Sequence, residues 1–440
     1  MIHMAILFGT VLTLWFFSLF EPVKSWKQAF FERPLPALLY SLSFLSVFLG
    51  NMKGGNIQSY IPDTVRYLRM LVLMLLFTFS STRLLMRIGN VWRAGVPILM
   101  MLFYALLAMV SASYSKAPLL SLWKGFEVFA LVLVPISLSD ELDRGEDLGW
   151  LLGVLNFILF FLALSVLVGL AVAPSEAIQN ISGGAWAGFY VRGVAPMINP
   201  NSVSQIGAFV AASEGVRLLS GGKNKWPLYV SLMVTLAGHS RTSIFALILC
   251  FFFVMARTKP RWMFTVVPAT TILLFLVGGL DVLRDYILRG QTEANFAALS
   301  GRTYLWPQVW RAFIEQPLIG QGFYAAHRIE FGISTVDNAH LEVLLGIGVV
   351  GYAVFLAPII WIIFTLVRWT LKISGATPQS TYHLQLCCLF TILFVRSVTG
   401  PSFNLLHHNL IIYGIGLTGL VHFCRMVSKS SDVVLKKRIP

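Results

Sequence analysis

Long apolar segments, separated by short polar connections, make up most of this chain. Apolar runs of about 17–20 residues recur throughout, which is the length that an α-helix needs to cross a bilayer. Three segments, 35–49, 204–217 and 226–238, are short or polar, and we expect them to be tilted or partly buried by neighbours. The pattern predicts an all-α polytopic transmembrane bundle. Its thirteen candidate spans lie at about 4–20, 35–49, 66–82, 96–113, 122–138, 149–173, 204–217, 226–238, 242–256, 262–280, 346–366, 384–397 and 407–424.

Composition agrees with this class. Only 12% of the 440 residues are charged, whereas a soluble domain usually carries about 25%, so a soluble core is excluded. The net charge of +14 would suit a nucleic-acid partner. However, most of the surplus Lys and Arg lies in loops on one side, and no basic array interleaved with aromatic residues occurs. We therefore predict the lipid bilayer as a partner and no nucleic acid.

The basic residues also orient the spans. The tail that follows the last span is basic, and the positive-inside rule places it in the cytoplasm. Counting back from it puts three loops on the opposite face: 174–203, the tight turn at 238–241, and 281–345. The third is too long for a simple connection, and long ordered loops are usually functional. Helical periodicity around 304–313 predicts that it forms a small helical cap.

This orientation divides the chain into three parts. Residues 1–280 hold ten spans with short loops, 281–345 form the large outer loop, and 346–440 hold three spans and the basic tail. The outer face receives Arg192, Arg241, Arg302 and His340. Cations gathered at a membrane surface are costly unless they bind an anion, and the planar fork of Arg pairs bidentately with phosphate oxygens. The four residues are therefore candidates for an anion site.

The outer loop carries several motifs in a fixed order. Residues 300–306 read Ser-Gly-Arg-Thr-Tyr-Leu-Trp, 317–323 read Pro-Leu-Ile-Gly-Gln-Gly-Phe, and 337–345 read Asp-Asn-Ala-His-Leu-Glu-Val-Leu-Leu. Upstream, 238–243 read Gly-His-Ser-Arg-Thr-Ser, and Arg192-Gly193 precedes Asn-Pro-Asn. This ordered set resembles the family of O-antigen ligases and O-antigen or exopolysaccharide polymerases. The resemblance is clear over roughly 190–350 and rests on hydropathy alone in the flanking spans.

The sequence departs from the family pattern at one position. The family has a His-Asn pair before the Leu-Glu, and its histidine falls on Asp337, with Asn338 matching the asparagine. His340 follows three residues later, on the same face of a helix, where it would replace the missing imidazole. Alternatively, Asp337 is itself the base, or it caps the following helix. Glu342 matches the family glutamate, and a carboxylate is favoured at a helix start in any case.

The resemblance implies a membrane glycosyltransferase of the bacterial inner membrane with its active site facing the periplasm. It implies transfer of a glycan from an undecaprenyl-diphosphate donor to an acceptor glycan, by a metal-independent inverting reaction without cofactors. The outer loops contain no Asp-x-Asp pair, which agrees with metal independence. The acceptor is a lipid-linked repeat unit for a polymerase or lipid A-core for a ligase. The changed histidine motif favours the polymerase, for which a chain-length regulator is a further partner to consider.

Each candidate has a simpler alternative. Arg241 sits where basic side chains snorkel to the interface, Arg302 could pair within its loop, and Arg192 is a lone loop arginine. Arg396, near the outer end of its span, is a further candidate for the anion site. A lipid-linked glycan transporter is the alternative function, but its charges would line a path through the bilayer, whereas here they gather at one face. The family commonly has twelve spans, which makes the segment 4–20 the surplus one.

Overall fold

The computed structural model describes residues 2–49, 64–139, 147–180, 189–261, 302–333, 335–373, 377–400 and 408–436, with a few isolated positions between 262 and 292. These residues are almost entirely helical, which confirms the predicted all-α polytopic fold. Within them, eight helices are long and apolar enough to cross a membrane, or nine if one bent pair counts as a single span. The predicted span 262–280 lies outside the described residues, apart from two isolated positions.

The first half of the chain begins with a bent pair of helices. The helix α1 ends at Phe17, inside the predicted span 4–20. The chain then bends, and α2 follows at an angle of 114° to α1. The elements are α1 (Ile2–Phe17), α2 (Glu21–Glu32), α3 (Pro34–Leu49), α4 (Thr64–Met86), the 3-10 helix η1 (Ile88–Ala94), α5 (Val96–Val110), the 3-10 helix η2 (Ser111–Ser113), α6 (Pro118–Ser137), α7 (Asp147–Val172) and α8 (Pro174–Ala177).

Two small antiparallel hairpins connect α8 to the second half. In the first, β1 (Ile178–Asn180) pairs with β2 (Phe189–Val191), and in the second, β3 (Gly193–Val194) pairs with β4 (Met197–Ile198). The helices that follow are α9 (Pro200–Leu219), α10 (Trp226–Ala237), α11 (Arg241–Thr258), α15 (Arg302–Glu315), α16 (Ala325–Phe331), α17 (Ala339–Lys372), α18 (Pro378–Thr399) and α19 (His408–Lys436).

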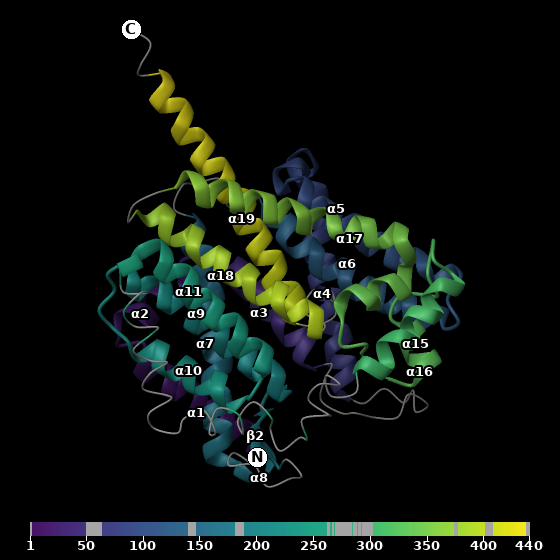
Figure 1. Cartoon of the computed structure of the whole chain (residues 1–440), viewed down its shortest axis with the longest axis horizontal. Coiled ribbons are helices and arrows are strands. Elements are labelled where there is room, and N and C mark those ends of the chain that lie inside the picture. Colours follow the sequence, from purple (N-terminus) through teal and green to yellow (C-terminus); the bar gives the residue numbers. More distant parts are fainter. Residues whose placement is uncertain are drawn as a thin grey trace.

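The helix α9 forms the centre of one half of the bundle. It packs against α7, α10, α11 and α18, and its side chains are buried along nearly its whole length (Figure 1). This burial by neighbouring helices is what the polar predicted span 204–217 requires. The predicted short spans 35–49 and 226–238 are also helices, α3 and α10.

The helices α15 and α16 lie beside α17 at one edge of the bundle (Figure 1). The first of them, α15, is the helix predicted from the periodicity around 304–313. A small apolar core joins them to α17, made by Val309, Ala326, Val336 and Leu345. The described part of the predicted outer loop therefore has packed structure of its own.

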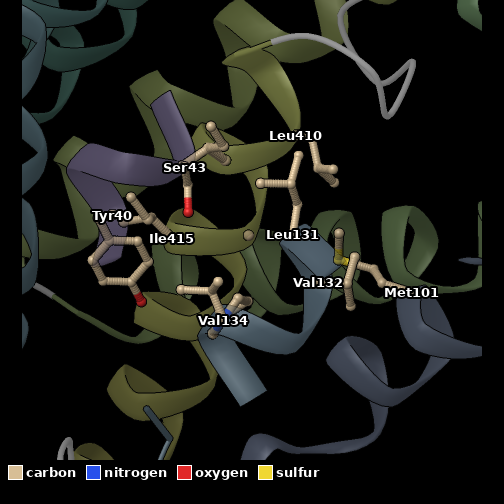
Figure 2. Close-up of a pocket in the computed structure, with 11 residues that line it drawn as sticks. Tyr40, Ser43, Met101, Leu131, Val132, Val134, Leu410 and Ile415 are labelled. Carbon is tan, nitrogen blue, oxygen red and sulfur yellow. The ribbon is translucent and has the colours of Figure 1, made fainter. Parts of the chain in front are cut away.

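A pocket in the core between α3, α5, α6 and α19 is too small for a substrate. It has a volume of about 10 Å³, which is space for one water molecule. Figure 2 shows Tyr40 and Ser43 of α3 facing it together with apolar side chains such as Leu131 and Ile415. The chemistry of this protein must be sought elsewhere.

Candidate active site

A break in α17 sets the position of the candidate residues that precede it. Gly348 has φ 65° and ψ −168°, so the helix is divided into a short first part and a long membrane-spanning part. A helix break leaves backbone N–H and C=O groups without their usual partners. Here the segment 317–322 supplies the partners that the break requires.

Four backbone hydrogen bonds join this segment to the break. The N–H groups of Gln321 and Gly322 donate to the carbonyls of Leu345 and Gly346, each at 2.8 Å. In the other direction, the N–H groups of 349 and 350 donate to the carbonyls of 317 and 318 at 2.8 and 3.2 Å. We call this interlocked arrangement the glycine latch. Its two halves are the Pro-Leu-x-Gly-x-Gly motif at 317–322 and the Gly-Ile-Gly sequence at 346–348.

Glycine is required at the contact points of the latch. A Cβ on Gly348 would lie 2.3 Å from the carbonyl oxygen of Leu318, and one on Gly320 would lie 2.6 Å from the backbone of Gly346. Both glycines also have positive φ, 65° and 72°, which L side chains rarely adopt. The latch therefore fixes the first part of α17 against the outer loop through backbone hydrogen bonds, in addition to the side-chain packing of the cap.

The first part of α17 is capped by Asn338, and Asp337 does not cap it. The side chain of Asn338 accepts hydrogen bonds from the N–H groups of His340 and Leu341 at 3.0 and 3.1 Å. The alternative role of Asp337 as the helix cap is therefore wrong, since the next residue fills it. Asp337 itself has a left-handed backbone, with φ 55°, and its carboxylate is turned to another partner.

Asp337 pairs with Arg302 at the start of α15. The guanidinium Nη2 lies 3.3 Å from the carboxylate Oδ2, and the two side chains are 23% and 41% exposed. The Nε atom of Arg302 is buried without a hydrogen-bond partner among the described residues. This loose, half-exposed pair leaves carboxylate oxygen and guanidinium donors available to a ligand.

Arg241 begins α11 and lies close enough to Arg302 for the two cations to repel each other. Two guanidinium groups in electrostatic contact raise the local positive potential. The start of α11 is fixed from the side by Arg396 of α18. Its Nη1 donates to Ser243 at 2.7 Å, to Ser240 at 3.3 Å, and to the carbonyl of Asn201 on α9 at 2.7 Å.

His340 of α17 links this helix to α18 through a hydrogen bond to Ser397. Its Nε2 lies 3.2 Å from the hydroxyl of Ser397, the residue after Arg396, and its Nδ1 lies 3.2 Å from the hydroxyl of Tyr352. The Ser397 hydroxyl donates to the carbonyl of Phe394, so it accepts from Nε2–H. The Nδ1 lone pair then accepts from Tyr352. Both ring nitrogens are thus engaged within the protein.

The structure therefore brings five candidate residues into one chain of neighbours. These are Arg241, Arg302, Asp337, His340 and Arg396, from the starts of α11, α15 and α17 and the end of α18. We call this group the arginine ring. Asn338 supports it as the helix cap.

Two other candidates have recorded contacts outside the ring. The Nε of Arg192, between β2 and β3, donates to the carbonyl of Glu176 at 2.6 Å. Glu342 is buried in the cap, with Oε1 3.6 Å from Nδ1 of His327 and Oε2 accepting from Thr335 at 3.3 Å. The described contacts give Glu342 a role in holding the cap on α17.

Sequence reasoning missed four hydroxyl residues that contact the ring: Ser240, Ser243, Tyr352 and Ser397. The contact between His340 and Ser397 joins residues 57 positions apart, and no local pattern announces it. For Tyr352, the break at Gly348 brings a residue twelve positions later in the chain back to the imidazole. Ser240 and Ser243 stood within a motif that the sequence singled out.

Two larger cavities in the described part of the chain lie away from the ring. One, of about 510 Å³, is apolar and lies between α1, α3 and α7. The other, of about 440 Å³, is polar and is lined by residues of α2, α7 and the start of α18, with Arg217 from the end of α9. That start is the opposite end of α18 from Arg396 and Ser397, so this cavity is remote from the ring.

Comparison with known proteins agrees with the resemblance read from the motifs. Residues 227–356 match the family model described as O-antigen ligase. The match contains the ring residues from Arg241 to His340 together with both halves of the glycine latch, whereas Arg192 and Arg396 lie outside it. No curated protein matches the chain.

Proposed function

We propose that this chain, whose residues 227–356 match the family model described as O-antigen ligase, transfers a glycan from undecaprenyl diphosphate to the hydroxyl of an acceptor sugar. The family gives the ligase or polymerase type of activity. The donor, the direction of the site and the roles of the residues are our inference. The observation that carries the proposal is the arginine ring, in which Arg302 pairs with a half-exposed carboxylate and lies within electrostatic range of Arg241.

The diphosphate of the donor binds Arg241 and Arg302. Their mutual repulsion is relieved when an anion lies between them, and the guanidinium forks match phosphate oxygens bidentately. As the glycosidic bond breaks, negative charge grows on the diphosphate. Preorganised cations stabilise that charge and thereby lower the barrier. Because these arginines supply the positive charge, we propose a metal-independent reaction.

Asp337 is the base that takes the proton of the acceptor hydroxyl. Its carboxylate is 41% exposed, so an acceptor can reach it, and it stands where the family pattern has histidine. His340, in contrast, has both ring nitrogens engaged by Ser397 and Tyr352. We assign His340 a positioning role, in which it holds the start of α17 against α18.

The reaction is a single displacement. The acceptor oxygen forms a bond to the anomeric carbon as the bond from that carbon to the diphosphate oxygen breaks. The hydroxyl proton passes to Asp337, and the electron pair of the broken bond leaves with undecaprenyl diphosphate. Attack from the face opposite the leaving group inverts the anomeric centre. The carboxylate becomes neutral as it accepts the proton, which frees Arg302 to interact more strongly with the departing diphosphate.

The polymerase is our preferred activity, with a lipid-linked repeat unit as acceptor, and the ligase acting on lipid A-core is the alternative. The preference rests on Asp337, which departs from the histidine of the ligase pattern. The ring lies at the end of α11 opposite Arg257 and at the end of α18 opposite Pro378. With the basic tail in the cytoplasm, this end faces the periplasm of an inner-membrane protein.

The test is complementation of a strain that lacks this gene, read on a gel of surface glycan. Arg241→Ala and Arg302→Ala should each abolish the polymer at normal protein level, and lysine should rescue poorly because the bidentate fork is lost. Arg311→Ala, an exposed arginine on the same cap helix, is the matched control and should be silent. Full-length glycan in both alanine variants would refute the assignment.

The same gel separates the two activities. Loss of a polymerase leaves single repeat units on the lipid A-core, whereas loss of a ligase leaves free, unligated polymer. Single units in the null strain would support the polymerase, and unligated polymer would establish the alternative.

A further inference from the structure

A second group of charged residues lies apart from the arginine ring, where α4, α6 and α16 meet. Arg69 of α4 donates to the Oε2 of Glu127 at 2.8 Å, and Lys124 of α6 donates to the same carboxylate at 2.9 Å. Arg328 of α16 donates to the hydroxyl of Tyr324 and stacks over its ring at 4.4 Å. The ammonium of Lys124 lies over the same ring at 5.0 Å. We call these residues the second cation cluster.

The charges of the cluster do not balance. Three cations surround one carboxylate, so two positive charges remain among the described residues. Lys124 lies within electrostatic range of Arg69, Arg328 and Glu127. Of the neighbouring carboxylates, Glu330 pairs with Lys116, and Glu342 contacts His327 while its charge also reaches Tyr324. Even with Glu342 counted, the cations outnumber the carboxylates among the described residues.

Burial makes this imbalance costly. The side chains of Arg69 and Lys124 are 15% and 13% exposed, and that of Glu127 only 2%. The Nε atoms of Arg69 and Arg328 have no hydrogen-bond partner in the described part of the chain. Cations near a bilayer are rare and mark ligand sites when they are not neutralised. A purely structural ion network would pair each cation, as Arg217 is paired with Glu214.

Tyr324 adds an independent observation. Its φ of 61° is left-handed, and for a bulky side chain this conformation is a genuine outlier that persists where the surroundings impose it. Burial raises the pKa of its phenol to about 12, so the ring stays neutral and adds no negative charge to offset the cations. The guanidinium of Arg328 and the ammonium of Lys124 both lie over the ring of this strained tyrosine.

The cluster lies at the end of the bundle that carries the ring. Arg69 and Lys124 are near the starts of α4 and α6, and the same stretch of the cap reaches both groups. Phe323, next to Tyr324, exchanges hydrogen bonds with Ser111 and Ser121, while His327 contacts Glu342 of α17. A ligand of the second cluster is therefore on the same side of the membrane as a ligand of the ring.

We propose that the second cation cluster binds the phosphate of a second lipid-linked substrate, namely the lipid carrier of the acceptor. This proposal rests on the proposed function, because a polymerase must hold two lipid diphosphates at once. Arg241 and Arg302 take the donor diphosphate, while Arg69, Lys124 and Arg328 take that of the acceptor. The acceptor's lipid anchor is then fixed under α16, with its sugar extending toward Asp337.

A binding measurement tests the site without depending on catalysis. In purified protein carrying Arg241→Ala and Arg302→Ala, inorganic diphosphate should still raise the melting temperature, because binding to the folded state stabilises it. Adding Arg328→Gln should remove most of this shift, and adding Arg311→Ala should not. No shift in the first protein, or an unchanged shift after Arg328→Gln, would overturn the proposal.

Kinetics then identify the ligand as the acceptor. Arg328→Gln is the gentler variant, because Arg328 donates to Tyr324 and not to Glu127, and Arg69→Lys is a second one that keeps the charge. In nanodiscs of phosphatidylcholine, Arg328→Gln should raise the KM for a lipid-linked acceptor about tenfold or more, the loss expected for one charge-assisted contact. The KM for the donor should change little. Arg69→Lys should have a smaller effect of the same kind.

The remaining outcomes separate the sources of the phosphate. If the effect of Arg328→Gln appears only when phosphatidylglycerol is present, the cluster serves bulk phospholipid and the acceptor assignment is wrong. If the donor KM rises instead, the cluster belongs to the donor site. If diphosphate binds but the protein has no transferase activity at all, the proposed function fails while the anion site remains.

Discussion

Replacement of Asp337 by asparagine separates a catalytic role of this residue from a structural one. Asparagine has the same shape, tolerates the left-handed backbone with φ 55°, and still offers an oxygen to Arg302. The variant thus removes the negative charge and the basicity of the side chain. It leaves the cap at Asn338 and the glycine latch untouched.

The expected effect on stability is small. The pair with Arg302 has an N–O distance of 3.3 Å, and 41% of the Asp337 side chain is exposed. Ion pairs that are this accessible to water contribute about 0–1 kcal/mol. Each kcal/mol lost shifts the melting temperature by roughly 2–4 °C. The melting temperature of Asp337→Asn should therefore lie within a few degrees of the wild-type value.

The expected effect on the rate is much larger. A positioned general base contributes about 10²–10⁴ to a reaction rate. By transition-state theory this corresponds to roughly 3–5 kcal/mol in the barrier, several times the stability term. The two quantities are separated enough to be distinguished in one variant.

The assay is glycan transfer by purified protein in nanodiscs, with lipid-linked donor and acceptor, at saturating concentrations of both. Asp337→Asn should lose turnover while its donor KM stays near wild type. His340→Asn is the comparison, and as a positioning residue it should lose about tenfold or less. The reasoning is refuted if Asp337→Asn keeps nearly full turnover, or if His340→Asn loses far more than Asp337→Asn.

Three further outcomes are expected. Gly348→Ala should lower the melting temperature and abolish activity, because its Cβ would lie 2.3 Å from the carbonyl oxygen of Leu318. Gly332→Ala is the control, because Gly332 has nearly the same φ, 63°, but its Cβ would meet nothing within 4 Å. An equal effect of both substitutions would show that the latch is unimportant. Ser397→Ala and Tyr352→Phe should each slow transfer by about tenfold or less, the value of one hydrogen bond, and full activity of the double variant would contradict a positioning role of the imidazole. Arg396→Lys should reduce turnover in the same transfer assay, because one ammonium cannot reproduce the planar contacts that fix the start of α11; wild-type turnover would contradict this.

The sequence was sufficient for the parts of the fold that depend on local patterns. Apolar length predicted the membrane helices, and a period of 3.6 residues predicted α15 around 304–313. The polar span 204–217 was expected to be buried, as α9 is. Each of these features follows from the composition and periodicity of its own segment, so one sequence contains the signal.

Other features depend on partners distant in the chain. The motif at 317–322 was visible as a pattern, but its function as half of a latch depends on the break at Gly348. Whether Asp337 or Asn338 caps α17 depends on a single φ angle that sequence does not specify. The hydroxyl partners of His340 are 57 and 12 residues away, which is beyond any local pattern.

The way in which the ring holds its cations explains why they suit an anionic substrate. The recorded hydrogen bonds of Arg396 go to a carbonyl and two serine hydroxyls, whereas Arg302 contacts a carboxylate at 3.3 Å that is itself half exposed. Elsewhere in the described chain, Arg217 lies 2.7 Å from Glu214, a carboxylate that is 1% exposed and cancels its charge. Neutral oxygens fix a guanidinium without lowering its potential, whereas a buried carboxylate fixes it and neutralises it. The recorded bonds of Arg396 are of the first kind, and the carboxylate that contacts Arg302 is too exposed to cancel its charge fully. Positive charge therefore stays available for the diphosphate. Introducing a buried carboxylate, as in Ser243→Asp beside Arg396, should keep the contact, cancel part of that charge and abolish transfer.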